Sequence, residues 1–450
     1  MLDESLLDSP EALARADTDA LLRGTAEAGA HVRTAVRQAG ETGLAGLRPD
    51  GRPRAVFVAG PGPVPGCVAD LIQALGNDTI PVTLLRPSGP LAAPGALRWA
   101  LPGWAGSLDL LLVTTPDGTE AGLTMLIEQA YRRGCTVVTL CPADVPVAEL
   151  TGETHGLAVP LVTSALGAWG GAGPPGGTAT GIPGRTGNGT GIGTGNGNGA
   201  GTGNGSGNGN GAGTGMDNGT DHARAPEGPP PVPHPQPVEP RMATAAPGLL
   251  WPLLTPLLVL CDRLGLFPAG EPALASLADR LDSVAERCGP AVATYSSPAK
   301  SLATELAGTV PLLWSEGALA RAVARHSAAV LASLPGLPAL AAGLPEAMAS
   351  HGALLSGTLA AASDPDDFFR DRVDEPEPLH ARIVLLRDQP PGAQSAVVAA
   401  RGLAYAHDVP LSELEPAEGS SPLEAAAELI ATVDFAAVYL ALADGGASSR

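Results

Sequence analysis

The segment LLLVTTPDGTEAGL holds the most informative group of hydroxyl side chains in the chain. An apolar, strand-like run ends in Thr114 and Thr115, and a Pro-Asp-Gly turn then leads to Thr119 and Glu120 at the start of a predicted helix. Parallel sheets bind ligands where their strands end, and hydroxyls together with the N–H groups of a helix N-terminus suit a phosphate. The pattern predicts a phosphate site. The alternative is that Thr119 only caps the helix and Glu120 only complements its dipole.

Strands and helices alternate on both sides of this segment. Apolar strand-like runs of the first half are RAVFVAG, IPVTLLR, LDLLLVTT and CTVVTLC, and those of the second half are TVPLLWS and ARIVLLRD. Helical stretches separate them, among them CVADLIQALG, TEAGLTMLIEQAYRRG and an Ala-rich stretch through His326. Continuous apolar strands that alternate with helices are typical of parallel sheets covered on both faces. The predicted fold class is α/β, with two doubly wound parallel-sheet domains.

A long low-complexity tract interrupts this pattern. Residues from about 170 to 215 are rich in Gly, Asn and Thr, and the stretch PEGPPPVPHPQPVEP that follows is rich in Pro. Neither can bury enough apolar surface to offset its chain entropy. We therefore expect a disordered insertion over about 170–240, followed by a buried helix at Leu249–Leu264.

Composition excludes several classes of partner. The formal charge is −20, aromatic residues make up 3%, and no stretch gathers basic residues, so nucleic acid is not an expected partner. The five cysteines are scattered without a C-x-x-C pair, which favours neither disulfides nor a zinc cluster. The N-terminus lacks the pattern of a signal peptide, and the apolar stretch Leu249–Cys261 is too short to cross a bilayer. We expect a cytoplasmic protein without a membrane partner.

Several segments resemble the bacterial and archaeal phosphoglucose/phosphomannose isomerases, which are tandems of two sugar-isomerase (SIS) domains. VTTPDGTEAGL resembles the S-x-S-G-x-T-x-E phosphate loop of that family, and AVFVAGPGPVPGCVADLI resembles its glycine-rich turn, which ends in an Asp, here Asp70. SSPAKSLATELAGTVPLLWS is similar to the family's P-A-K-x-L-A stretch and includes Lys300, the only lysine of the chain. EPRMATAAPGLLWPLLTPLL is similar to the Pro-Arg segment that closes the first SIS domain, and includes Arg241.

The resemblance implies a domain organisation and a reaction. The first SIS domain would span 1–268 with the insertion inside it, a connecting helix 269–292, and the second SIS domain 293–450. The reaction would be the aldose–ketose isomerisation of glucose 6-phosphate or mannose 6-phosphate to fructose 6-phosphate, without metal or other cofactor. The partner would be a phosphorylated hexose, and the sequence is compatible with a homodimer.

The resemblance also implies roles for individual residues. Thr114, Thr115, Thr119, Arg241 and Lys300 would bind the substrate phosphate. For catalysis, the family's histidine follows a Pro-Glu pair, which points to Glu346 and His351 as the carboxylate and the acid/base. The alternative is that Glu346 and His351 are ordinary residues of a helix, and that Arg241 is a solvated charge.

The chain departs from the family at three chemical positions. Pro116 and Asp117 stand where the family's loop has Ser and Gly, and Ala328 stands at about the place of its catalytic glutamate. These changes remove a hydroxyl donor and the expected base. They keep open a second function, a catalytically lapsed phosphosugar-binding regulatory or scaffold protein, and a third, an interaction protein without a sugar ligand.

Overall fold

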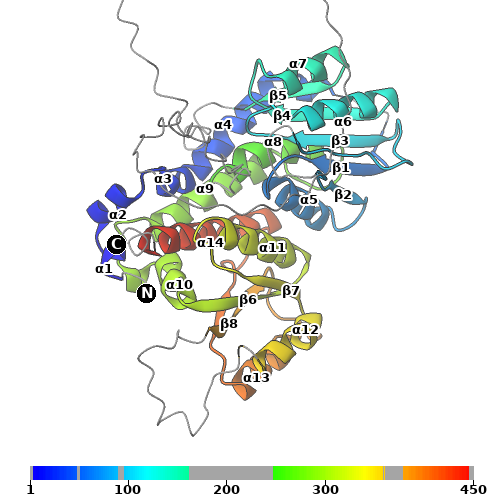
Figure 1. Ribbon diagram of the computed structural model, residues 1–450. Helices are drawn as coiled ribbons and strands as arrows, with labels where there is room; N and C mark the ends of the chain where they lie inside the picture. The colour runs from blue at the N-terminus through cyan, green and yellow to red at the C-terminus, as the bar shows by residue number, and fades with distance from the viewer. Residues whose placement is uncertain are drawn as a thin grey trace, which may run out of the picture. The chain divides into compact units, whose positions relative to one another are not determined.

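The computed structural model describes residues 4–47, 51–89, 96–161, 247–357, 359 and 379–444. The insertion predicted over about 170–240, and with it Arg241, lies outside these residues. The described chain contains two parallel β-sheets with helices packed on them (Figure 1). The predicted fold class, α/β with two doubly wound sheets, is confirmed.

The first sheet has five parallel strands in the spatial order β2-β1-β3-β4-β5. The strands are β1 (Ala55–Ala59), β2 (Val82–Leu85), β3 (Asp109–Thr114), β4 (Thr136–Cys141) and β5 (Leu157–Pro160), and the connecting helices are α5 (Val64–Leu75), α6 (Ala121–Arg132) and α7 (Pro146–Glu153). The strand order reverses between β1 and β3, so the turns after these two strands flank the position where this kind of sheet binds ligands.

The second sheet repeats the first four positions of this order, as β7-β6-β8-β9. Its strands are β6 (Thr309–Glu316), β7 (Leu340–Gly343), β8 (His380–Arg387) and β9 (Leu411–Leu414), and its helices are α11 (Ala318–Ser333), α12 (Glu346–Leu355) and α13 (Val397–Ala406). By order, β6 and α11 correspond to β1 and α5 of the first sheet, and β8 and α13 to β3 and α6.

Successive residues of one strand enter different cores. In β1, Val56 and Val58 belong to one apolar cluster and Phe57 to another. In β6, Leu313 belongs to the cluster that holds Val56, and Trp314 to a third. Because side chains of a strand alternate between the two faces of its sheet, each sheet is buried on both faces. One face of each sheet contributes to the same apolar cluster.

The remaining helices belong to this shared cluster or pack around it. They are α1 (Glu4–Leu7), α2 (Pro10–Ala16), α3 (Leu21–Ala26), α4 (Ala28–Glu41), η1 (Gly43–Gly46), α8 (Leu250–Arg263), α9 (Glu271–Cys288), η3 (Thr294–Ser296), α10 (Pro298–Leu306) and α14 (Pro422–Asp444). The helix predicted at Leu249–Leu264 is confirmed as α8, which packs against α4 and α5. The domain boundaries proposed above stay predictions.

Helix α14 is the most apolar of the long helices. In the described part of the chain it alone is long and apolar enough to cross a membrane, over Pro422–Ala443, and 89% of its apolar window is buried inside the protein. It packs against α9, α10 and α11. This burial is typical of the central helix of a large core.

Candidate functional site at the strand ends

In the loop between β3 and α6, the Asp117 carboxylate accepts hydrogen bonds from residues of the same loop. The Thr115 hydroxyl donates to Asp117 Oδ1 at 3.0 Å, and the Thr119 N–H reaches the same oxygen at 3.3 Å. The Gly118 N–H donates to Thr115 Oγ1 at 3.0 Å. These are the hydroxyl and amide groups that the sequence predicts for a phosphate. In this chain the Thr115 hydroxyl and the Thr119 N–H are bonded to Asp117, which stands where the resemblance places a glycine.

Thr114 and Thr119 differ in their surroundings. Thr114 is buried, and its hydroxyl has no protein partner, whereas Thr119 is exposed. The residue that precedes the first turn of α6 is Glu120, which is buried. The prediction that Thr119 caps this helix is wrong, because α6 begins one residue later than that prediction required.

The turn after β1 lies directly beside the end of β3. A Cβ on Gly60 would be 2.0 Å from the Thr114 carbonyl oxygen, so only glycine permits this approach. Proline reduces the donors of the turn, since neither Pro63 nor Pro65 carries an N–H. The N–H groups of Gly66 and Cys67 both bond to the Pro63 carbonyl, at 3.0 and 3.3 Å. The start of α5 is therefore poor in donors for an anion.

The corresponding edge of the second sheet is also capped by a carboxylate. Asp388, directly after β8, accepts the N–H groups of Leu319 and Ala320 in the first turn of α11, at 3.1 and 3.2 Å. Gly317 has a φ of 104°, and a Cβ there would lie 2.4 Å from the Asp388 carboxylate. Burial raises the pKa of Asp388, its bonds to the backbone lower it, and the nearby charge of Glu316 raises it again.

A second carboxylate holds the neighbouring helix at this edge. Glu316, the last residue of β6, accepts the Ser395 hydroxyl at 2.8 and 2.9 Å and the Ala396 N–H at 2.8 Å. Both groups lie at the start of α13. The N-termini of α11 and α13 are thus both bonded to carboxylates of the chain itself.

Glu346 and His351 lie on one uninterrupted helix, α12. Five residues at 3.6 per turn place their side chains about 140° apart around the helix axis. Glu346 is exposed, whereas His351 is buried and its Nδ1 accepts the Trp314 indole N–H at 2.9 Å. Burial lowers the pKa of His351. The structure does not bring the two predicted catalytic groups to one face.

Lys300 is fully buried and bonded to the backbone. Its three ammonium donors reach carbonyl oxygens at 2.6, 2.9 and 2.6 Å, those of Leu7, Pro290 and Val292. The ammonium also lies 5.4 Å from the centre of the Tyr439 ring. Burial lowers the pKa of Lys300, and the charge of Asp8 opposes this. Since an ammonium has three donors, none is left for a phosphate, and Lys300 fastens the N-terminal segment instead.

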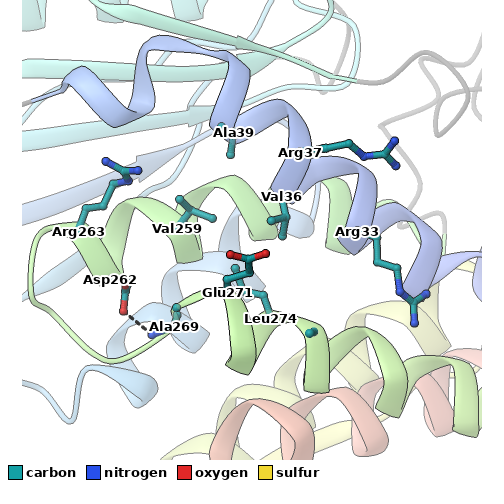
Figure 2. A pocket seen from close by; sticks show the side chains of 13 residues that line it. Arg33, Val36, Arg37, Ala39, Val259, Asp262, Arg263, Ala269, Glu271 and Leu274 are labelled. Carbon is teal, nitrogen blue, oxygen red and sulfur yellow. Dashed lines mark hydrogen bonds between the residues drawn. The ribbon is translucent and has the colours of Figure 1, made fainter.

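A cavity of about 620 Å³ lies away from the strand ends, between α4, α8 and α9 (Figure 2). Its floor is apolar, with Val36 and Leu274 among the lining residues. One arginine of its lining, Arg33, pairs with Asp279 and Asp282, each at 2.7 Å, and Asp262 and Glu271 also line the cavity. Of the predicted site residues that the structure describes, none lines this cavity.

Sequence reasoning missed Asp388 and Glu316. The available signal was that each lies at or directly after the end of an apolar strand, as Thr114 and Thr115 do. Within the described ranges, no three His, Cys, Asp or Glu side chains are grouped to hold a metal ion.

Comparison with known proteins identifies the domain type of the second half of the chain. Residues 295–447 match the bacterial phospho-glucose isomerase C-terminal SIS domain. No curated protein matches the chain.

Several solved structures are similar to this chain at low sequence identity. A hypothetical protein from Thermus thermophilus is 11% identical with a TM-score of 0.51, over 97% of this chain and 89% of that one. The tagatose-6-phosphate ketose/aldose isomerase from Escherichia coli is 11% identical with a TM-score of 0.48, over 94% and 91% of the two chains. A glucose-6-phosphate isomerase like protein, also from Thermus thermophilus, is 26% identical over 43% of this chain and 58% of that one, with a TM-score of 0.29.

The class of the protein follows from the fold and the family match. The second sheet lies in the segment that matches the bacterial phospho-glucose isomerase C-terminal SIS domain, and the first sheet contains the same strand order. The resemblance to the phosphoglucose/phosphomannose isomerases that was stated from the sequence is confirmed over residues 295–447.

Proposed function

We propose that this chain is a phosphosugar isomerase-type SIS protein that has lost turnover and serves as a regulatory or scaffold protein responsive to a phosphorylated hexose. The observation that carries the proposal is the Asp117 carboxylate, which bonds to Thr115 and Thr119 in the loop where the family binds phosphate. A phosphate that enters this loop has to displace a carboxylate and meets its negative charge. We therefore expect weak binding of glucose 6-phosphate or mannose 6-phosphate.

The groups for the chemical step support the same proposal. Isomerisation requires an acid/base that opens the sugar ring and a carboxylate that moves a proton between C1 and C2. Ala328 stands at about the place of the family's base, and the Nδ1 of His351 is engaged by Trp314. Loss of a general base costs about 10²–10⁴ in rate.

A second candidate is the isomerase itself, converting glucose 6-phosphate or mannose 6-phosphate to fructose 6-phosphate. The family match over 295–447 favours it, since that segment contains Glu346 and His351.

In either case we propose a cytoplasmic protein, because its five cysteines are free, buried thiols that a reducing compartment preserves. A homodimer remains part of the proposal.

Two measurements on the full chain separate the candidates. A coupled assay follows fructose 6-phosphate formation from each hexose phosphate, and calorimetric titration follows binding of the same two sugars. Detectable binding with negligible turnover supports the lapsed enzyme. Robust turnover that is abolished in Glu346→Gln, an exposed and therefore foldable variant, establishes the isomerase and contradicts our proposal. Absence of binding for both sugars leaves a protein without a sugar ligand and also contradicts it.

A further inference from the structure

A buried polar cluster lies where helices of the two sheets meet. His326 of α11 places its Nε2 2.8 Å from Asp434 Oδ1 of α14, and both side chains are almost completely buried. Cys67 of α5, also buried, interacts with the same imidazole. Helix α11 packs against both α5 and α14. The cluster therefore joins one helix of the first sheet to two helices of the second half.

The imidazole in this cluster is held in its charged form. Burial alone opposes the charge, but the interactions of the imidazole with Cys67 and Asp434 outweigh it and hold the pKa of His326 well above its usual value of 6.5. A buried carboxylate that accepts an imidazolium N–H gains a charge-assisted hydrogen bond. Removing one partner would leave the other charge buried and unpaired, which is strongly destabilising.

A second ion pair joins α11 directly to α5. Arg325 of α11 bonds to Asp70 of α5 at 3.0 Å, beside the residues that form the cluster. Burial raises the pKa of Asp70, and the charges of Arg325 and Arg86 lower it.

Several other charged groups on the packed elements have partners elsewhere. Glu424 and Glu428 of α14 pair with Arg280 and Arg287 of α9, while Glu316, Asp388 and Arg387 are bonded at the strand ends of β6 and β8. Strand β7 carries no titratable side chain. On α8, Cys261 is buried, and burial raises the pKa of its thiol to about 12, so it stays neutral. The polar and charged side chains at the contact between α5 and α11 are Cys67, Asp70, Arg325 and His326, and Asp434 of α14 is bonded to His326.

We infer that Cys67, His326 and Asp434 form a charged clamp that fastens α5 of the first sheet to α11 and α14 of the second half. Its effect depends on pH with a definite sign. His326 holds a proton in the folded chain that it loses near pH 6.5 when unfolded, so the clamp's contribution is complete below about pH 6.5 and declines as pH rises toward the raised value. The turn that precedes α5 lies beside Thr114, so the clamp also connects the end of β3 to the helices of the second half.

His351 provides a matched control within the same molecule. It is a second buried histidine, but its ring accepts a hydrogen bond from Trp314 and burial lowers its pKa. Its contribution therefore has the opposite dependence: it is complete above about pH 6.5 and declines as pH falls. A general effect of pH on the chain would move both histidine variants in the same direction.

The test combines nitrogen NMR of the histidine rings with thermal unfolding of the full chain. At about pH 7.5 we expect the His326 ring to retain both N–H groups. The His326 signals are assigned by their loss in His326→Gln, and in Asp434→Asn their titration should move to lower pH, because burial then lacks the opposing carboxylate charge.

Unfolding then tests the clamp. The difference in unfolding temperature between wild type and His326→Gln should shrink as pH rises above 6.5, and that for His351→Gln should shrink as pH falls below it. A His326 ring that titrates at or below pH 6.5 in the wild-type chain overturns the inference, even if a variant fails to fold. A difference for His326→Gln that does not change with pH overturns it as well.

Discussion

The strand-end edges of the two sheets are both occupied by carboxylates of the chain, but they hold them differently. At the first edge, Asp117 is exposed and bonds to residues two positions away in its own loop. At the second edge, Asp388 reaches across 68 or 69 residues to the first turn of α11, and Glu316 reaches α13. The first carboxylate belongs to a turn, whereas the second pair belongs to the packing of the sheet. We therefore expect that removing the Asp117 carboxylate leaves the tertiary structure intact, whereas removing Asp388 or Glu316 weakens the packing of helices on the second sheet.

Substitution of Lys300 has the largest expected effect on stability. It tests whether Lys300 stabilises the fold or belongs to the candidate phosphate site. Lys300→Met should lower the free energy of unfolding by about 3 kcal/mol or more, because three backbone carbonyls lose charge-assisted bonds from a buried ammonium. Urea unfolding measures this loss. Thr304→Ala, on the same helix α10 with only a bond to the nearby Ser301 carbonyl, should cost far less. If Lys300→Met folds with wild-type stability and instead loses hexose phosphate binding, the assignment of Lys300 to the fold is wrong.

Asp388 tests whether the second edge is structural. Asp388→Ala should cost about 1–3 kcal/mol of stability, since two N–H groups of α11 lose their acceptor. Asp388→Asn keeps an acceptor oxygen and should cost less. Unfolding by urea compares the two variants. Equal stability of Asp388→Ala and wild type would show that the Asp388 carboxylate does not stabilise the packing of α11.

The pH dependence of the same position has a predicted sign. Because the folded pKa of Asp388 is raised, its favourable contribution is present below the usual value of 3.8 and is lost as pH rises through the folded pKa. The stability of wild type relative to Asp388→Asn should therefore fall as pH increases from about 4 upward. Unfolding curves over this range check it, and a rise in relative stability would refute the assigned environment.

Thr114 gives the smallest expected effect and probes the first edge. Its buried hydroxyl has no protein partner, and Val has nearly the same shape. Thr114→Val should therefore raise stability by up to about 1 kcal/mol, because a buried unpaired polar group is costly. Differential scanning calorimetry measures the change, with exposed Thr119→Val as the control. A loss of stability instead would mean that the hydroxyl has a bound partner.

The sequence predicted those features that depend on local pattern. The apolar strands and the helix at Leu249–Leu264 follow from periodicity, and both are confirmed. The start of α6 was misplaced by one residue, since Thr119 is a better capping residue than Glu120 by composition alone. Lys300 was assigned by resemblance, and its partners Leu7 and Tyr439 are distant in sequence. The same holds for Asp388 with α11, and for His326 with Asp434, because such contacts exist only once the sheets are assembled.

The most direct test of the central claim is a calorimetric titration of glucose 6-phosphate into wild type and Pro116→Ser/Asp117→Gly. The double variant restores the loop residues of the family and removes the carboxylate that holds Thr115 and Thr119. Our account predicts that the variant binds glucose 6-phosphate at least about tenfold more tightly, which is equivalent to about 1.4 kcal/mol. Equal or weaker binding by the variant would show that Asp117 does not occupy a phosphate position, and would contradict the account.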